Sequence, residues 1–180
     1  MTTVFKEYEH LPFGDWKILI EIMIRGCFTR QSAILEFSLF KIIVYCDTNN
    51  TELTKKFKSQ TLGGKLKWAQ EMLPLHYAKL YDSYKPLFTE LFFENGLLRV
   101  RNDLIHYVFQ FNEETKDKSS LDVRITKYEP SLNDIENIIL RKTYSIEELD
   151  TTLRRFQDIN VEFLGLPAFV GVLHQQTYLC

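Results

Sequence analysis

The amino-acid sequence predicts a mainly α-helical protein, a helical bundle with a small β-hairpin inserted before its last long helix. Two observations predict this class, and a third predicts the number of domains. Apolar residues recur at helical spacing along most of the chain, and they alternate with polar residues in one short region. No repeat, low-complexity segment or linker divides the 180 residues, so we expect a single domain, 1–180, large enough for its own core.

The first part of the chain is expected to form two helices after a mobile or loosely docked lead-in at residues 1–14. Asp15 is a suitable N-cap for the first helix, and Gly26 is expected to break or interrupt it. The second helix, over residues 29–46, is apolar on nearly every side. This pattern is typical of a helix that is buried in a core or shared with a partner chain.

Three further helices are predicted before the hairpin. The third spans residues 62–72 and is expected to end at Pro74, because proline disrupts a helix interior. The fourth covers residues 80–93, and Gly96 stands at a typical position for terminating it. The fifth follows at once and is expected to continue to about Phe111.

The hairpin is predicted from a change of period. Apolar and polar residues alternate over 121–126, which is the pattern of a half-buried strand. A second candidate strand covers 138–144, and the two would be joined by a long turn near Pro130. The sequence therefore predicts a β-hairpin insert at residues 121–144.

A last long helix is predicted after the hairpin. Ser145 and Glu148 have the spacing of a capping box, and a clear apolar face follows them. The helix is expected to stop near Gly165 and Pro167, since both residues are unfavourable in a helix interior. The tail, 168–180, is apolar enough to pack but too short to assign.

Composition and charge argue against several classes of protein. The net charge of -2 and the sequence pI of about 6.1 count against a protein that coats nucleic acid non-specifically. The three cysteines are odd in number and widely spaced, which argues against a disulfide framework. The sequence shows neither a signal peptide nor an apolar run of about 18 residues, so we expect a cytoplasmic protein that makes no membrane contact.

The sequence offers no recognisable metal or cofactor site. Its four histidines, His10, His76, His106 and His174, are dispersed, and no HExxH motif or cysteine pair accompanies them. The segment 62–65 lacks the spacing of a phosphate-binding loop. We therefore expect neither a metal nor a cofactor, and candidate chemistry is confined to one segment.

That segment is Arg101–His106, which reads RNDLIH. Arg101 lies on an apolar helical stripe, where a charged group is costly unless it is paired. Asn102 and His106 are four positions apart, so they share a helical face and can touch. Arg101 and His106 differ by five positions, about 140° around a helix, so we expect them to point in divergent directions. A symmetric partner chain would then bring a second arginine and histidine to the same site, and this geometry predicts a dimer.

RNDLIH resembles the Arg-x4-6-His motif of the HEPN superfamily, in which the residue after the arginine is often polar and frequently asparagine. The surroundings are similar as well: helices precede the motif, one of them carries Glu36, another starts with Leu62-Gly63, and a capped helix follows. The resemblance spans loosely residues 29–164. It implies an up-and-down helical bundle that dimerises and brings two such motifs together.

The resemblance also implies a function. Many HEPN proteins are metal-independent endoribonucleases of toxin–antitoxin or antiviral systems, whereas others are inactive and only dimerise or act as scaffolds. Because Arg101, Asn102 and His106 are all present, the resemblance favours the active class, a toxin, defence or RNA-processing factor. It implies a homodimer, an RNA substrate and a cognate antitoxin or other partner protein. The residues expected to support the three catalytic ones are Asp103, Glu36 and Tyr107.

The same three residues suit metal-free RNA cleavage on chemical grounds. In that reaction the 2′-hydroxyl attacks its own phosphorus, which requires proton transfer and stabilisation of a charged phosphorane. An imidazole exchanges protons near neutral pH, so His106 can serve as general base or acid. The Arg101 guanidinium offers a forked set of donors to phosphate oxygens, and Asn102 can orient the histidine ring.

Two other interpretations stay open. In a structural one, Arg101 pairs with a buried carboxylate such as Glu36 or Asp103, while Asn102 and His106 form a polar cluster that fixes helix register. In the other, the chain is a ligand-sensing or antitoxin-like module that binds a nucleotide without cutting it. An accessible His106 favours the enzyme and a buried one favours the scaffold. Whether the chain is an enzyme is therefore open at this point.

Overall fold

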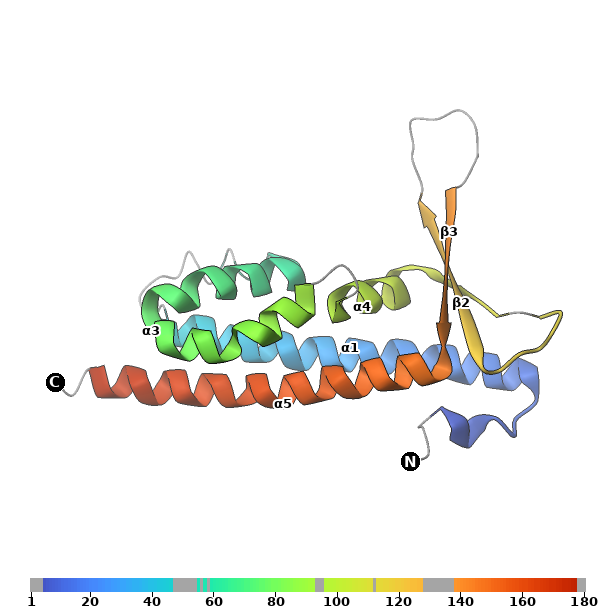
Figure 1. Ribbon diagram of the computed structural model, residues 1–180, viewed down its shortest axis with the longest axis horizontal. Helices are drawn as coiled ribbons and strands as arrows, with labels where there is room; N and C mark the ends of the chain where they lie inside the picture. Colours follow the sequence, from blue (N-terminus) through green and yellow to red (C-terminus); the bar gives the residue numbers. More distant parts are fainter. Residues whose placement is uncertain are drawn as a thin grey trace. The chain divides into compact units, whose positions relative to one another are not determined.

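The computed structural model describes residues 5–46, 55, 57, 59–92, 96–111, 113–127 and 138–177. The described chain is mainly helical, which confirms the predicted class (Figure 1). Its helical elements are η1 (Lys6–Tyr8), α1 (Phe13–Cys46), α3 (Leu62–Phe92), α4 (Leu97–His106) and α5 (Ile146–Thr177). Its strands are β1 (Val108–Gln110), β2 (Ser120–Lys127) and β3 (Ile138–Ser145). Within this described part, no helix carries an apolar stretch long enough to cross a membrane.

The chain packs into two compact units, and the single domain expected from the sequence stays a prediction. Unit 1 combines Met1–Thr29 with Arg99–Arg155, and unit 2 combines Arg30–Leu98 with Phe156–Cys180. Helices α1 and α5 each contribute residues to both units. The motif RNDLIH belongs entirely to unit 1.

Unit 1 is held together by apolar side chains from both ends of its sequence. Phe5, Trp16 and Leu104 are fully buried, and Tyr144 almost so. The Lys118 ammonium donates hydrogen bonds to two backbone carbonyl oxygens of the lead-in, those of Glu9 and Leu11, at 2.7 and 2.6 Å. Residues 5–11 of the lead-in therefore contribute a core side chain and are tied to the loop that precedes β2.

The strands of unit 1 form an antiparallel sheet in the order β1-β2-β3. Strand β2 pairs with β3 from Ser120 opposite Ser145 to Lys127 opposite Ile138, while the turn that was expected near Pro130 lies outside the described residues. Strand β1 adds a third member, with Phe109 opposite Val123. The structure therefore has a three-stranded sheet where the sequence predicted a two-stranded hairpin.

The motif helix is shorter than expected. We predicted that it would continue to about Phe111, but α4 ends at His106 and Val108–Gln110 form β1. Valine and phenylalanine fit a pleated surface at least as well as a helix, and the buried Phe109 gains cross-strand neighbours on β2. Tertiary pairing therefore decides the conformation of these residues.

Helices α1 and α3 also differ from the expectation. Helix α1 begins at Phe13, ahead of Asp15, which was expected to be its N-cap, and it runs unbroken through Gly26, since a glycine costs only about 1 kcal/mol in a helix interior. Helix α3 passes Pro74, where an end was expected, and kinks at Tyr77 instead, where φ is -143° and ψ is 56°. The kink lies between the two helices predicted over this range, 62–72 and 80–93, although the helix continues past Pro74.

Helix α5 starts as predicted and ends later. The Glu148 backbone N–H donates to the Ser145 Oγ at 2.9 Å, which is the first half of the predicted capping box. The helix then continues through Gly165 and Pro167 to Thr177, although a stop was expected there. In unit 2, the centroids of the Phe163 and Phe88 rings lie 5.1 Å apart, so tertiary packing holds α5 just before these two residues.

Candidate functional site

The last two turns of α4 bring the three predicted catalytic side chains together. The Arg101 Nη1 donates a hydrogen bond to the Asn102 Oδ1 at 2.8 Å and lies 3.3 Å from the His106 Nε2. Asn102 and His106 are exposed, and Arg101 is partly buried. Because a guanidinium has only donors, a hydrogen bond to His106 requires a neutral imidazole that accepts at Nε2 and carries its proton on Nδ1.

This geometry corrects the expectation that Arg101 and His106 diverge. Their backbone positions differ by roughly 140° around an ideal helix, yet the Nη1 and Nε2 atoms are 3.3 Å apart. The arginine side chain is long enough to bridge this angle, so the direction of its Cβ does not decide where its charge lies. One chain is therefore sufficient to place both groups together, and the geometric argument for a dimer is wrong.

The role expected for Asn102 also changes. We predicted that Asn102 would orient the His106 ring, since the two are one helical turn apart. Its Oδ1 instead accepts the hydrogen bond from Arg101. Asn102 thus holds the guanidinium, and the guanidinium in turn meets the ring. Partial burial lowers the pKa of Arg101, but an arginine remains charged near neutral pH.

Asp103, expected as a supporting residue, faces the core of unit 1. Only 5% of Asp103 is exposed, and its Oδ2 accepts a 2.8 Å hydrogen bond from the Tyr144 hydroxyl. The Lys142 Nζ lies 3.9 Å from the same oxygen and 4.6 Å from the centre of the Tyr144 ring. Burial first, and then the Asp103 carboxylate, raise the pKa of Tyr144 far above its usual value. Asp103 therefore fastens α4 to β3.

Glu36, the other carboxylate expected to support the motif, lies in unit 2. It forms an ion pair there with Lys65, a buried residue whose ammonium also lies 5.0 Å from the centre of the Phe57 ring. Burial lowers the pKa of Lys65. The contacts that the structure gives Glu36 are thus those of an intra-unit pair, and they carry no support for the motif.

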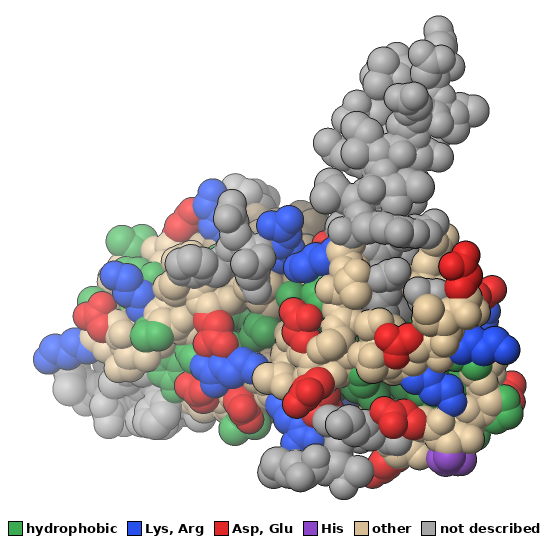
Figure 2. Space-filling model, turned by 45° about the vertical axis from the view of Figure 1, so that its right-hand side comes forward, with side chains coloured by type: hydrophobic (Ala, Val, Ile, Leu, Met, Phe, Trp, Pro, Cys, Tyr) green, Lys and Arg blue, Asp and Glu red, His purple; other side chains and the backbone are tan. Residues whose placement is uncertain are grey.

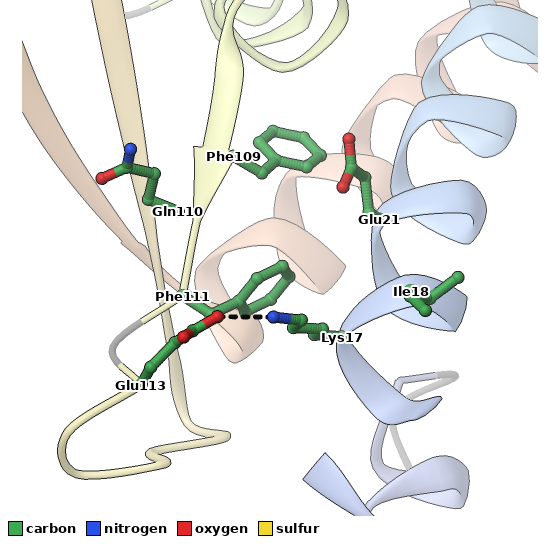
Figure 3. Close-up of a pocket in the computed structure, with 7 residues that line it drawn as sticks. All are labelled: Lys17, Ile18, Glu21, Phe109, Gln110, Phe111 and Glu113. Atoms are coloured by element: carbon green, nitrogen blue, oxygen red, sulfur yellow. Dashed lines mark hydrogen bonds and ion pairs between the residues drawn. The ribbon is translucent and has the colours of Figure 1, made fainter. Parts of the chain in front are cut away.

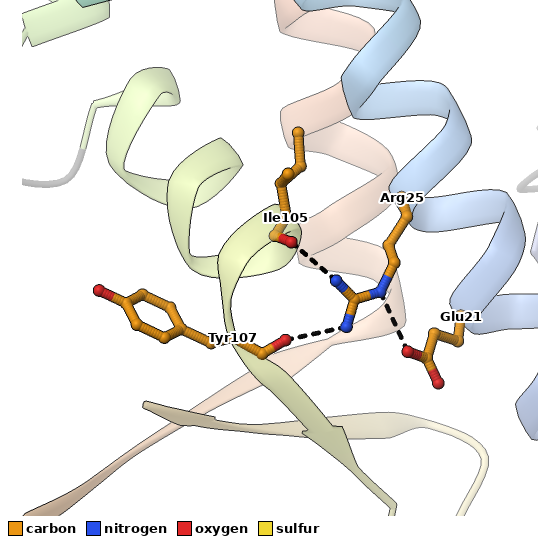
Figure 4. A network of polar contacts seen from close by, with 4 residues as sticks. All are labelled: Glu21, Arg25, Ile105 and Tyr107. Atoms are coloured by element: carbon orange, nitrogen blue, oxygen red, sulfur yellow. Dashed lines mark hydrogen bonds and ion pairs between the residues drawn. The ribbon is translucent and has the colours of Figure 1, made fainter. Parts of the chain in front are cut away.

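A residue that the sequence analysis did not select, Arg25 on α1, holds the end of the motif helix (Figure 4). Its Nη1 donates to the Ile105 carbonyl oxygen at 2.8 Å, and its Nη2 donates to the Tyr107 carbonyl oxygen at 2.9 Å. These two carbonyls flank His106 in the chain. A cation at a helix C-terminus satisfies carbonyls that have no partner within the helix and interacts favourably with its dipole.

Two further contacts fix the Arg25 guanidinium. Its Nε donates to the Glu21 Oε1 at 3.0 Å, and its Cζ lies 4.5 Å from the centre of the Phe109 ring. The pair Glu21 and Arg25 is readable from the sequence as a helical i,i+4 pair. Its targets lie 80 and 82 positions away, so no local pattern could reveal them. Tyr107, predicted as a supporting residue, enters this network through its backbone carbonyl.

The site so defined offers an imidazole, a guanidinium and an amide, which together can transfer a proton and bind an anion. Among the described residues, no group of three or more His, Cys, Asp or Glu side chains is placed to hold a metal ion. The side chains of His76 and His174 lie outside that set. Comparisons of the chain with protein-family models, with curated proteins and with solved structures find no match.

Proposed function

We propose that this chain is a metal-independent endoribonuclease of the HEPN type in which Arg101 and His106 act on one phosphodiester. The observation that supports the proposal best is an exposed imidazole whose Nε2 lies 3.3 Å from an arginine Nη1. The exposure of His106 is what the enzyme requires and what a purely structural cluster does not need. The resemblance of RNDLIH to the family motif is the second support.

The proposed reaction follows from the chemistry of these groups. His106 takes the proton from the 2′-hydroxyl, and the 2′-oxygen forms a bond to phosphorus as the bond to the 5′-oxygen breaks. Arg101 leaves the imidazole and donates to the non-bridging phosphate oxygens, whose charge grows in the phosphorane. A protonated imidazole or water returns a proton to the leaving 5′-oxygen. The products are a 2′,3′-cyclic phosphate and a 5′-hydroxyl end.

We further propose that the active form is a homodimer and that RNA is its substrate. Side chains that are large, apolar and exposed provide material for an interface in either unit, among them Ile18 and Ile22 on α1 and Val161 on α5. On the face shown in Figure 2, acidic and basic side chains of the described residues are interspersed. In this proposal, the arginine of the motif binds the phosphate. In a toxin or defence system, a cognate antitoxin or other partner protein would restrain the activity.

A second candidate function is an inactive dimerisation, scaffold or ligand-sensing module. The observation in its favour is that Arg101 is partly buried and donates to its own neighbour, Asn102, as a residue that only stabilises the helix end would do. In that case Arg101, Asn102 and His106 are structural. The two functions differ in whether RNA is cut and in whether removal of the imidazole matters.

The test is cleavage of a mixed RNA pool by the purified protein with and without EDTA. We expect cleavage in both conditions, with 2′,3′-cyclic phosphate ends, because the proposed chemistry uses only side chains. Loss of cleavage with chelator and its recovery with a divalent ion would show that the chemistry is different. Light scattering tests the dimer, since twice the 21.4 kDa chain mass is expected at micromolar concentration. A monomer there would remove the dimer from the proposal.

A further inference from the structure

Each unit contains a pocket of similar size in which a lysine lies beside a glutamate. In unit 1 the pocket has a volume of about 470 Å³, and Lys17 is paired there with Glu113 (Figure 3). In unit 2 the pocket has a volume of about 420 Å³, and Lys65 is paired there with Glu36. Both volumes lie within the range of about 300–1,000 Å³ that is common for small-molecule sites. The proposed function uses neither pocket.

The two lysines differ in their exposure. The Lys17 side chain is 35% exposed, so water can solvate its ammonium, whereas the Lys65 side chain is only 8% exposed. The Lys65 Nζ donates to the Glu36 Oε1 and lies 5.0 Å from the centre of the buried Phe57 ring. An ammonium has three donors, and the described residues give that of Lys65 no second oxygen or nitrogen acceptor. A polar group of a ligand can therefore bind to this buried nitrogen.

The remaining wall of the unit 2 pocket is apolar. Ala33, Phe37 and Phe40 lie at helical spacing on one face of α1, and Phe57 lies opposite them in the contact list of the pocket. The Phe57 ring packs against the rings of Phe40 and Trp68, with centroids 6.1 and 6.4 Å away. Ala33 and Phe37 are exposed, so a ligand can enter on their side. These walls fit an apolar ligand that carries one small polar group.

We propose that Lys65 captures an apolar aldehyde in this pocket as an imine. A lysine that is desolvated in apolar surroundings is activated as a nucleophile toward carbonyl carbon. Burial lowers the pKa of Lys65, so its neutral amine is easier to form near neutral pH. An aldehyde is itself neutral, so its binding brings no charge that competes with Glu36 for the ammonium.

The reaction can take place within the Lys65–Glu36 pair. The ammonium gives a proton to the carboxylate, and the neutral Nζ attacks the carbonyl carbon while Glu36 returns this proton to the carbonyl oxygen. The nitrogen then passes a second proton to Glu36, which transfers it to the hydroxyl oxygen as the C–O bond breaks and water leaves. The product is a protonated imine beside an ionised Glu36. The pocket therefore holds one cation and one anion before and after the reaction.

The test traps the imine with sodium cyanoborohydride, which reduces it to a stable secondary amine. The full chain is treated with benzaldehyde at neutral pH, and mass spectrometry of its peptides measures the benzyl group on each lysine. We expect Lys65 to be labelled several-fold more than Lys17 in the other pocket and than Lys67, an exposed neighbour on the same helix. The preference should disappear in guanidinium chloride, because unfolding gives the three amines the same environment. Equal labelling in the folded protein would overturn the proposal.

A second aldehyde tests whether the phenylalanine rings select the ligand. Glycolaldehyde has the same reactive group but carries a hydroxyl in place of the ring, so it gains little from apolar walls. The excess of labelling at Lys65 over Lys17 should be several-fold smaller with glycolaldehyde than with benzaldehyde. The same excess with both compounds would overturn the apolar class of ligand.

A matched pair of variants tests the pocket itself. Ala33 lines the pocket and Ala78 on α3 does not, and both are exposed helical residues of unit 2. Ala33→Glu brings a second carboxylate to the pocket, which favours the charged form of Lys65, so labelling of Lys65 should fall several-fold. Ala78→Glu should leave it unchanged. Thermal melting verifies that each variant is folded, and equal effects of the two substitutions would contradict the site.

Aldehyde capture and RNA cleavage are tested independently. Lys65→Arg keeps the charge but cannot form the imine, so the preferred labelling should vanish while RNA cleavage stays the same. Lys17→Arg should keep the preferred labelling. If Lys65→Arg does not fold, the labelling of the unaltered chain still decides the question. Preferred labelling that persists in folded Lys65→Arg protein would show that another amine is responsible and would overturn the proposal.

Discussion

The two faces of helix α4 differ more than its short sequence suggests. On one face, Asn102 and His106 are exposed and Arg101 reaches both. On the other, Asp103 is 5% exposed and Leu104 is fully buried. Neighbouring residues of one motif thus have different tasks, because successive helical positions are about 100° apart. Acid–base chemistry belongs to the exposed face, and the acidic residue of the motif serves stability.

The largest effect is expected from the exposed face. His106→Ala should lower the rate of RNA cleavage by roughly 10²–10⁴-fold, because it removes the general base and acid. The melting temperature should hardly change, since His106 is exposed. His10→Ala, another exposed histidine, is the control and should cleave like the parent. If both variants cleave equally, the activity does not come from this motif.

Arg101 tests whether the exposed face is catalytic or structural. Arg101→Lys keeps the charge and loses the planar fork, so cleavage should fall by roughly 10²-fold while the melting temperature moves little. If Arg101 were the partner of a buried carboxylate, Arg101→Ala would destabilise the fold by about 3–5 kcal/mol. Melting temperature and RNA turnover are therefore measured for both variants. Unfolded proteins would favour the structural interpretation.

On the buried face, a substitution should lower the stability of the fold and leave RNA cleavage unchanged. Tyr144→Phe removes the donor that lies 2.8 Å from the buried Asp103 carboxylate. The free energy of unfolding should fall by about 1.5–3 kcal/mol, as is typical of a hydrogen bond to a charged group. Cleavage per folded molecule should be unchanged. Tyr81→Phe, at a partly buried ring in unit 2, serves as the control. A loss of cleavage in stably folded Tyr144→Phe protein would contradict the division between the faces.

The smallest effect is expected at Arg25, which donates hydrogen bonds to backbone carbonyls at the C-terminal end of α4. Arg25→Met should lower kcat by roughly tenfold with a smaller change in KM, because the carbonyls on both sides of His106 lose their donors. Arg30→Met, at an exposed position of the same helix, should change neither constant. An unchanged kcat in Arg25→Met would show that the last turn of α4 keeps its conformation without Arg25.

The sequence predicts the helical class and the location of the motif because both depend on local spacing. It does not predict that α4 ends at His106, since that end depends on Arg25 and on strand β2. It also overestimates Gly26 and Pro167 as helix breakers, because helices α1 and α5 run through them although a glycine costs about 1 kcal/mol and a proline about 3 kcal/mol in a helix interior.

The site was predicted in part for the same reason. The three residues of the motif do lie together, but the contact between Arg101 and His106 depends on a side-chain conformation, which helical geometry does not determine. The separate environments of Asp103 and Glu36 depend on partners far along the chain, Tyr144 for the first and Lys65 for the second. The sequence alone therefore does not identify which carboxylate, if any, pairs with Arg101.

The division of the chain into units also has a consequence for protein synthesis. Unit 1 needs both Met1–Thr29 and Arg99–Arg155, and unit 2 is likewise completed only by Phe156–Cys180. As the ribosome extends the chain, the apolar side chains of α1 therefore emerge long before the segments that bury them. Contacts between such distant segments form slowly, and exposed apolar surface favours aggregation or chaperone binding in the interval. A nascent chain that stalls before α5 would leave both units open.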